Sequence, residues 1–165
     1  MRYHKIRKMD ISNGPGVRVS IFMQGCAFNC KNCFNPETHD YHGGKEFTDD
    51  TINRVMELCE NENVEGLSIL GGEPMHPKNI EGTTKLAKTF KEKFPNKNLW
   101  AWTGFQFDKD LKDKEVLKYI DVLVDGQYAD ELHNPTLSWR GSENQRVIDV
   151  QKSLKNGEVT VWEDA

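Results

Sequence analysis

The sequence predicts a single-domain α/β protein, folded as an incomplete (β/α) barrel with a mainly parallel sheet. Short apolar runs rich in β-formers alternate with segments of helical periodicity along most of the chain. Such alternation is typical of a parallel sheet covered by helices. The chain has 165 residues, whereas a closed eight-stranded barrel needs about 250. We therefore expect one open barrel domain over residues 1–165.

The first half of the chain predicts the order strand, helix, strand, helix. Residues 17–23 (VRVSIFM) form the first expected strand, which ends just before the first cysteine. A helix is expected from Thr48, which is a suitable N-cap followed by acidic residues and by apolar residues at helical spacing. Residues 66–70 (GLSIL) predict a buried strand that runs into the sequence GGEP, and Pro77 is expected to open the next helix.

The second half continues this pattern more weakly. Strands are expected at residues 99–103 (LWAWT), from Asp121 (DVLVDG) and from Arg146 (RVIDV), with a weaker helix around residues 110–118. The chain is then expected to turn at residues 155–157 into the sequence EVTVW. Trp100 and Trp102 lie two positions apart and so face the same side, most simply the core.

Composition argues against nucleic-acid and membrane partners. The formal net charge is −4, and acidic and basic residues are interspersed, so no broad basic field is expected to bind a phosphate backbone. There is no apolar run long enough to span a bilayer and no secretory signal at the N-terminus. We expect a cytoplasmic protein.

Candidate functional residues lie at the carboxyl ends of the expected strands. These ends are followed by Cys26, by Gly71 to Pro74, by Thr103 with Gly104, and by Asp125 with Gly126. Ligands of parallel α/β sheets bind beyond the carboxyl ends of the strands. The candidate residues should therefore meet at one rim.

Three of the chain's four cysteines lie within eight residues: Cys26, Cys30 and Cys33. Without an export signal, cysteines point to metal or redox chemistry rather than to disulfides. Thiolates are the usual protein ligands of iron–sulfur clusters. Cys59 falls on the apolar face of its expected helix, where a structural role is the simpler interpretation. A 4Fe-4S cluster on this loop would then keep one iron open, as a catalytic cluster requires.

Local spacing alone leaves a structural zinc site open. His39 or His42 would complete a set of three cysteines and one histidine, which suits tetrahedral zinc. Both histidines are also explained as exposed loop residues. The glycine-rich strand end opposite the cysteines favours the cluster, since a zinc knuckle does not require it.

Several motifs resemble the radical S-adenosylmethionine superfamily. The cysteine spacing and, later, Gly71-Gly72-Glu73-Pro74 are the broad features, and residues 13–18 (NGPGVR) look like those of activases that install glycyl radicals. Further segments are similar to the activating proteins of anaerobic ribonucleoside-triphosphate reductases: residues 33–38 (CFNPET), 102–105 (WTGF), 121–126 (DVLVDG) and 140–146 (RGSENQR). The likeness covers roughly Met1 to Val150. Asn32 departs from the superfamily pattern, which usually has an aromatic residue there, and Phe34 is the nearest replacement.

The resemblance implies a mechanism. S-adenosylmethionine chelates the open iron, and an electron from the cluster cleaves it to methionine and a 5′-deoxyadenosyl radical. That radical takes a hydrogen atom from a glycine in the large subunit of the anaerobic reductase. A flavodoxin-like protein is the electron donor that the family suggests. In this mechanism the cofactor carries the hard chemistry, and the protein positions it.

The resemblance also assigns cofactor contacts. Backbone groups at Gly71 and Gly72 approach the methionine ammonium, with the Glu73 carboxylate nearby and Pro74 completing the turn. The backbone of residues 32–34 (Asn32, Cys33 and Phe34) contacts the adenine. Asp125 orients the ribose or the incoming peptide.

Other interpretations stay open at this stage. Gln145 and Arg146 fit either contacts to the same ligands or partner, or a solvated polar turn. Two rival functions remain: a radical enzyme of the same superfamily with a small-molecule substrate, and a zinc-stabilised binding module without catalysis.

Overall fold

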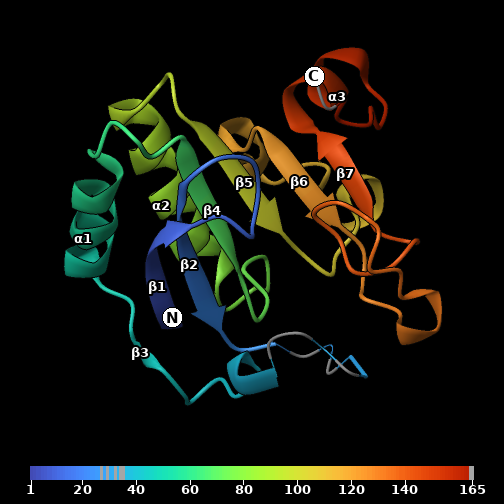
Figure 1. Cartoon of the computed structure of the whole chain (residues 1–165), viewed down its shortest axis with the longest axis horizontal. Coiled ribbons are helices and arrows are strands. Elements are labelled where there is room, and N and C mark those ends of the chain that lie inside the picture. The colour runs from blue at the N-terminus through green and yellow to red at the C-terminus, as the bar shows by residue number, and fades with distance from the viewer. Residues whose placement is uncertain (27, 29, 32, 34–35, 164–165) are drawn as a thin grey trace.

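The computed structural model describes residues 1–26, 28, 30–31, 33 and 36–163, which form one seven-stranded sheet with helices (Figure 1). The strand order is β3-β1-β2-β4-β5-β6-β7. The strands are β1 (Arg2–Asp10), β2 (Arg18–Gln24), β3 (Lys45–Glu46), β4 (Gly66–Gly71), β5 (Asn98–Trp102), β6 (Val122–Asp125) and β7 (Arg146–Asp149). The α-helices are α1 (Asp49–Cys59), α2 (Ile80–Lys93) and α3 (Val150–Asn156).

The sheet is mixed, so the prediction of a mainly parallel sheet is wrong. Strands β2, β4, β5 and β6 run parallel, as expected of the central βαβ pattern. At one edge β1 is antiparallel to both β2 and β3, and at the other β7 is antiparallel to β6. The α/β class and the single sheet are confirmed. A barrel-like curvature of this open strand order stays a prediction.

The edges differ from expectation because their sequences carry weak signals. Strand β1 is rich in basic residues and lacks regular apolar alternation, so it was not expected as a strand. The expected helix at residues 110–118 is instead a π-helix (Phe107–Leu111) followed by a 3-10 helix (Glu115–Tyr119). Helix α3 was also not expected.

One face of the sheet packs against α1 and α2. Both helices contribute to the same apolar core, α1 through Val55 and Cys59 and α2 through Leu86 and Phe90. Strand β2 is buried along its whole length. Among the helices in the described ranges, none has both the length and the apolar character that a membrane span requires.

The other face carries all four tryptophans of the chain in one cluster. Trp100 and Trp102 project from β5, whereas Leu99 and Ala101 of the same strand point into the helical core. The Trp100 ring lies 4.9 Å from that of Trp162 and 5.8 Å from that of Trp139, measured between centroids. The segments before and after β7 are thereby joined to the centre of the sheet.

Arg18 is a buried cation that connects three parts of the fold. Its guanidinium donates hydrogen bonds to Ser68 Oγ at 2.7 Å, to the Pro15 carbonyl at 3.0 Å and to the Leu67 carbonyl at 3.1 Å. The side chain is fully buried, and this burial lowers the pKa of Arg18 to about 10. It therefore fixes the loop before β2 against β4.

Replacing Arg18 by methionine should destabilise the fold strongly, because these three acceptors and the Asn98 carbonyl, 3.4 Å from Nη2, lose their donor. We expect the free energy of unfolding to fall by at least about 2 kcal/mol, since bonds to charged groups contribute about 1.5–3 kcal/mol each. Denaturant unfolding measures the change. Arg54→Met, on the exposed side of α1, is the matched control and should change it by less than about 0.5 kcal/mol. Equal losses in both variants would contradict this role of Arg18.

Candidate functional site

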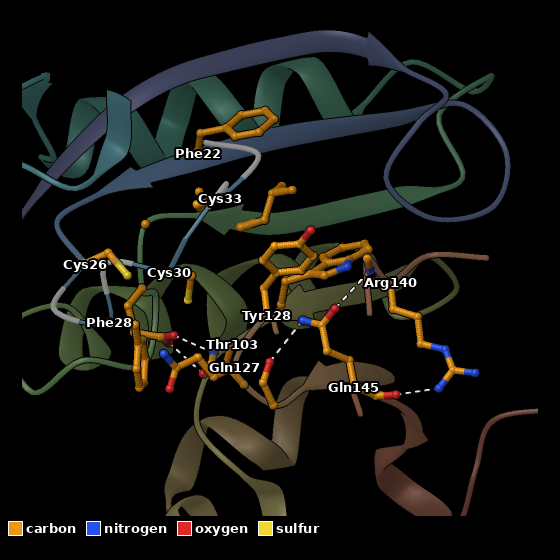
Figure 2. A pocket seen from close by; sticks show the side chains of 18 of the residues that line it. Phe22, Cys26, Phe28, Cys30, Cys33, Thr103, Gln127, Tyr128, Arg140 and Gln145 are labelled. Carbon is orange, nitrogen blue, oxygen red and sulfur yellow. Dashed lines mark hydrogen bonds between the residues drawn. The ribbon is translucent and has the colours of Figure 1, made fainter. Parts of the chain in front are cut away.

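A cavity of about 420 Å³ lies beyond the carboxyl ends of the parallel strands. It is lined by residues that follow β2, β4, β5 and β6, so the ends of these four strands do meet at one rim, although Pro74 and Asp125 are not part of the lining. Figure 2 shows Cys26 and Cys30 on one side of this cavity and Arg140 and Gln145 on the other.

Cys26, Cys30 and Cys33 all line the cavity and are partly exposed. A backbone hydrogen bond from Cys33 to Cys30, at 3.2 Å, closes a turn between the second and third cysteines. Asn32 and Phe34, the other expected adenine contacts, lie outside the described residues.

Cys59 is separate from this group. It is fully buried in the helical core, and burial raises the pKa of its thiol to about 12. A protonated thiol in such surroundings is a poor metal ligand.

Two histidines were candidates for completing a zinc site. Of these, His39 lines the cavity, and its Nε2 is buried without a hydrogen-bond partner. His42 is not among the residues that line the cavity. Within the described ranges, no three His, Cys, Asp or Glu side chains form a ready-made metal-binding group.

The cysteine loop is held to the rest of the rim by backbone hydrogen bonds. Gly25 donates to the Thr38 carbonyl at 2.6 Å, and Cys26 donates to the His39 carbonyl at 3.2 Å. In turn the Gly25 carbonyl accepts a bond from the Glu73 backbone at 2.7 Å. The first cysteine is thereby placed directly beside the end of β4.

The two glycines after β4 are required by this close approach. A Cβ on Gly72 would lie 2.5 Å from the Gly25 carbonyl oxygen and 2.8 Å from that of Thr38. Gly71 has φ of +115° and lies against the backbone of Met23, so a side chain there would be both strained and obstructed. The sequence GGEP therefore lets two strand ends touch.

Glu73 joins the end of β4 to the end of β5. Its carboxylate accepts hydrogen bonds from Thr103 Oγ1 and the Gly104 backbone, both at 2.6 Å, and from the Met75 backbone at 2.8 Å. The side chain is 1% exposed, and this burial raises the pKa of Glu73 to about 7 against the opposing effect of the three donors. Its expected contact with a ligand ammonium stays a prediction.

Two other expected residues lie outside the cavity lining. Pro74 is buried, and its carbonyl accepts a bond from Thr83 in α2 at 2.8 Å. Asp125 is also buried, and its carboxylate accepts bonds from the Phe107 backbone at 2.8 Å and from Arg146 at 2.6 and 3.0 Å. Both residues support the rim from behind, which leaves the role of Asp125 toward a ligand untested.

The sequence interpretation missed several residues that line the cavity. Arg7 lies over the Phe22 ring, 5.0 Å from its centroid, and Phe28 packs against Gly104. Tyr128 and Trp139 come from the connection between β6 and β7. The length of that irregular connection was the available signal, because long loops inside a compact domain are usually functional.

Similar proteins match nearly the whole chain. Residues 12–148 match the family described as a 4Fe-4S single cluster domain. An anaerobic ribonucleoside-triphosphate reductase-activating protein of Enterobacteria phage T4 is 40% identical over 89% of this chain and 93% of its own length. Proteins of the same name from Vibrio cholerae and Escherichia coli K12 are 38% and 36% identical, each over 89% of this chain and 97% of their own.

Gly72→Ala should disrupt the contact between the cysteine loop and β4. Because the added Cβ meets backbone atoms, the loop has to move, and overpacking of this kind costs about 1–3 kcal/mol. The free energy of unfolding, measured with denaturant, and the iron content after reconstitution should both decrease. Gly82→Ala in α2 is the control, since its Cβ meets only the flexible Met1 side chain. A Gly72→Ala protein as stable as Gly82→Ala would show that the glycine is dispensable.

Proposed function

Because the chain belongs to the family of anaerobic ribonucleoside-triphosphate reductase-activating proteins, we propose that it activates such a reductase with S-adenosylmethionine and a 4Fe-4S cluster. When bound, the cluster and S-adenosylmethionine supply the one-electron chemistry that removes a hydrogen atom from a glycine of the large reductase subunit, leaving a glycyl radical there. The observation that carries the proposal is the meeting of Cys26, Cys30 and Cys33 with Gly71 and Gly72 in one cavity.

The donor set of the cavity fits such a cluster. Three thiol sulfurs on one loop are soft ligands of the kind that iron–sulfur clusters need, and Cys59 is too deeply buried to provide a fourth. Three protein ligands leave one iron for S-adenosylmethionine. The backbone bonds of Gly25 and Cys26, together with the Gln24 side chain, which donates to the Glu37 and Asp40 carbonyls, support this loop.

The residues after β4 would orient the bound cofactor. Gly71 and Gly72 expose backbone without side chains to the cavity, which suits close contact with the amino group of S-adenosylmethionine. The Glu73 carboxylate adds negative potential behind them while it is kept in place by Thr103 and Gly104. Cys33 with Asn32 and Phe34 is proposed for the adenine side.

Residues 1–165 would form one radical S-adenosylmethionine core domain in which the open strand order leaves an entrance for the partner's peptide. The protein would work in the cytoplasm with the large reductase subunit and a low-potential, flavodoxin-like donor. Asp125, through Arg146, would keep the ends of β6 and β7 in place for this purpose.

Activation should be visible by electron paramagnetic resonance. The reduced, reconstituted protein, incubated without oxygen with S-adenosylmethionine and the anaerobic reductase, should produce a glycyl doublet on the reductase and one 5′-deoxyadenosine for each radical. Omitting S-adenosylmethionine is the control and should abolish both. Formation of 5′-deoxyadenosine without a glycyl signal would leave the cofactor chemistry intact and reject the reductase as substrate.

Single cysteine variants should separate the cluster ligands from Cys59. Cys26→Ala, Cys30→Ala and Cys33→Ala should each lose most of the bound iron and the signal of the reduced cluster, because each removes one of three ligands. Cys59→Ala should keep both, and its cost should appear only in stability. Iron, sulfide and zinc analysis after anaerobic purification gives the answer. Zinc in place of iron in the unaltered protein would contradict the proposal.

A further inference from the structure

The wall of the cavity opposite the cysteines has no assigned role. It is built from Gly126 to Tyr128 and Trp139 to Gly141, together with Gln145, all within or beside the connection between β6 and β7. Figure 2 shows Tyr128, Arg140 and Gln145 on this side, with Gln127 nearer to Thr103 and Phe28. Since the proposed cofactor contacts lie at the cysteine end, this wall faces whatever else enters the cavity.

Apart from Trp139, whose ring packs on Trp100, this connection is held mainly by polar contacts. Of residues 127–145, only Ser142 is buried. Asn144 donates a hydrogen bond to the Gln127 carbonyl at 2.7 Å, and Asn134 donates one to the Glu143 carboxylate at 3.2 Å. The rest of the segment buries little apolar surface, so its exposed side chains are available to a partner.

Gln145 fixes the part of the connection that reaches the cavity. Its Oε1 accepts bonds from the backbone of Gly141 at 2.9 Å and of Ser142 at 3.1 Å, and its Nε2 donates to the Gly126 carbonyl at 3.0 Å. One side chain thus ties residues 141–142 to the end of β6. The guanidinium of Arg140 in turn donates to the backbone carbonyl of Gln145.

Trp139 is held in a conformation that non-glycine residues rarely adopt, with φ of +67°. Its carbonyl accepts a bond from Trp102 Nε1 at 2.8 Å, and its ring packs on Trp100. Backbone strain of this kind persists only where the surroundings impose it, and it is concentrated at functional sites. The strained residue directly precedes Arg140, so it sets the direction in which the chain presents that side chain.

The proposed substrate limits how it can be recognised. A glycine offers no side chain of its own, so hydrogen bonds to the backbone of its segment are a direct way to fix its position. Backbone carbonyls are acceptors, and an arginine has five N–H donors, of which Arg140 uses Nη1 in its hydrogen bond to Gln145. Among the described lining residues the only carboxylate is Glu73, whose oxygens already accept three bonds. The cavity wall is therefore rich in donors.

We propose that residues 139–141, positioned by Gln145, are the docking surface for the glycine-bearing segment of the reductase, and that Arg140 donates hydrogen bonds to its backbone carbonyls. This inference rests on the proposed function and adds to it a division of the cavity. The cysteine end holds the cofactors, and the opposite wall holds the peptide. Gln145 is a positioning residue in this arrangement, because it acts through residues 141 and 142.

Two variants test the docking surface. Arg140→Met removes the donors and keeps the apolar stem, and Gln145→Glu keeps the acceptor for Gly141 and Ser142 but turns an oxygen toward the Gly126 carbonyl. For each, we would measure glycyl radical yield against reductase concentration, and 5′-deoxyadenosine formation without reductase. The reductase concentration at half-maximal yield should rise at least tenfold. The rate of S-adenosylmethionine cleavage without reductase should change far less than this.

The controls separate recognition from folding. Arg54→Met on α1 and Glu131→Ala, which is exposed within the connection but outside the cavity lining, should leave the half-maximal concentration unchanged. Iron content and thermal unfolding identify any variant that fails to fold, and direct binding of the reductase to the loaded protein gives a second measure of affinity. The proposal is overturned if, in Arg140→Met and Gln145→Glu, glycyl radical formation and reductase-independent cleavage of S-adenosylmethionine fall by the same factor. It is also overturned if the affinity for the reductase does not change. An absent glycyl signal in the unaltered protein would instead reject the proposed function.

Discussion

The buried carboxylate of Glu73 holds the functional end of the sheet together. Its side chain takes hydrogen bonds from the residues after β5, and its backbone N–H donates to Gly25, beside the first cysteine. A buried carboxylate with fewer donors would be costly to the fold. Three strand ends thus share one anchor, and the cysteine loop, the glycine turn and the start of the β5 connection are positioned relative to one another by it.

Much of the centre of this fold could be predicted, because its signals are local. The apolar runs at β2, β4 and β5 and the helical spacing of α1 depend on burial, which sequence reports directly. The direction of the strands at the two edges of the sheet could not be predicted in this way. Strand β1, which lies between β2 and the short edge strand β3, has a polar sequence without regular apolar alternation, and nothing local in the sequence of β7 indicates that it runs antiparallel to β6.

The same distinction applies to the candidate site. The cysteines and glycines were found because their chemistry or their conformational freedom is unusual at fixed spacing. Asp125 ends an apolar strand and Thr103 follows one, but the partner of Asp125, Arg146, is distant in sequence and draws the carboxylate behind the rim. Only the three-dimensional arrangement shows which polar residue at a strand end faces the cavity.

The tryptophan cluster makes the protein's fluorescence a report from a single place. Every indole of the chain lies in one group, on the face of the sheet that bears the cavity, and Trp102 and Trp139 are part of the cavity wall. Tryptophan emission from this chain therefore comes from one region only. A group that enters the cavity and absorbs at the wavelengths of tryptophan emission would quench most of the tryptophan fluorescence. Occupancy of the site can therefore be followed without a label.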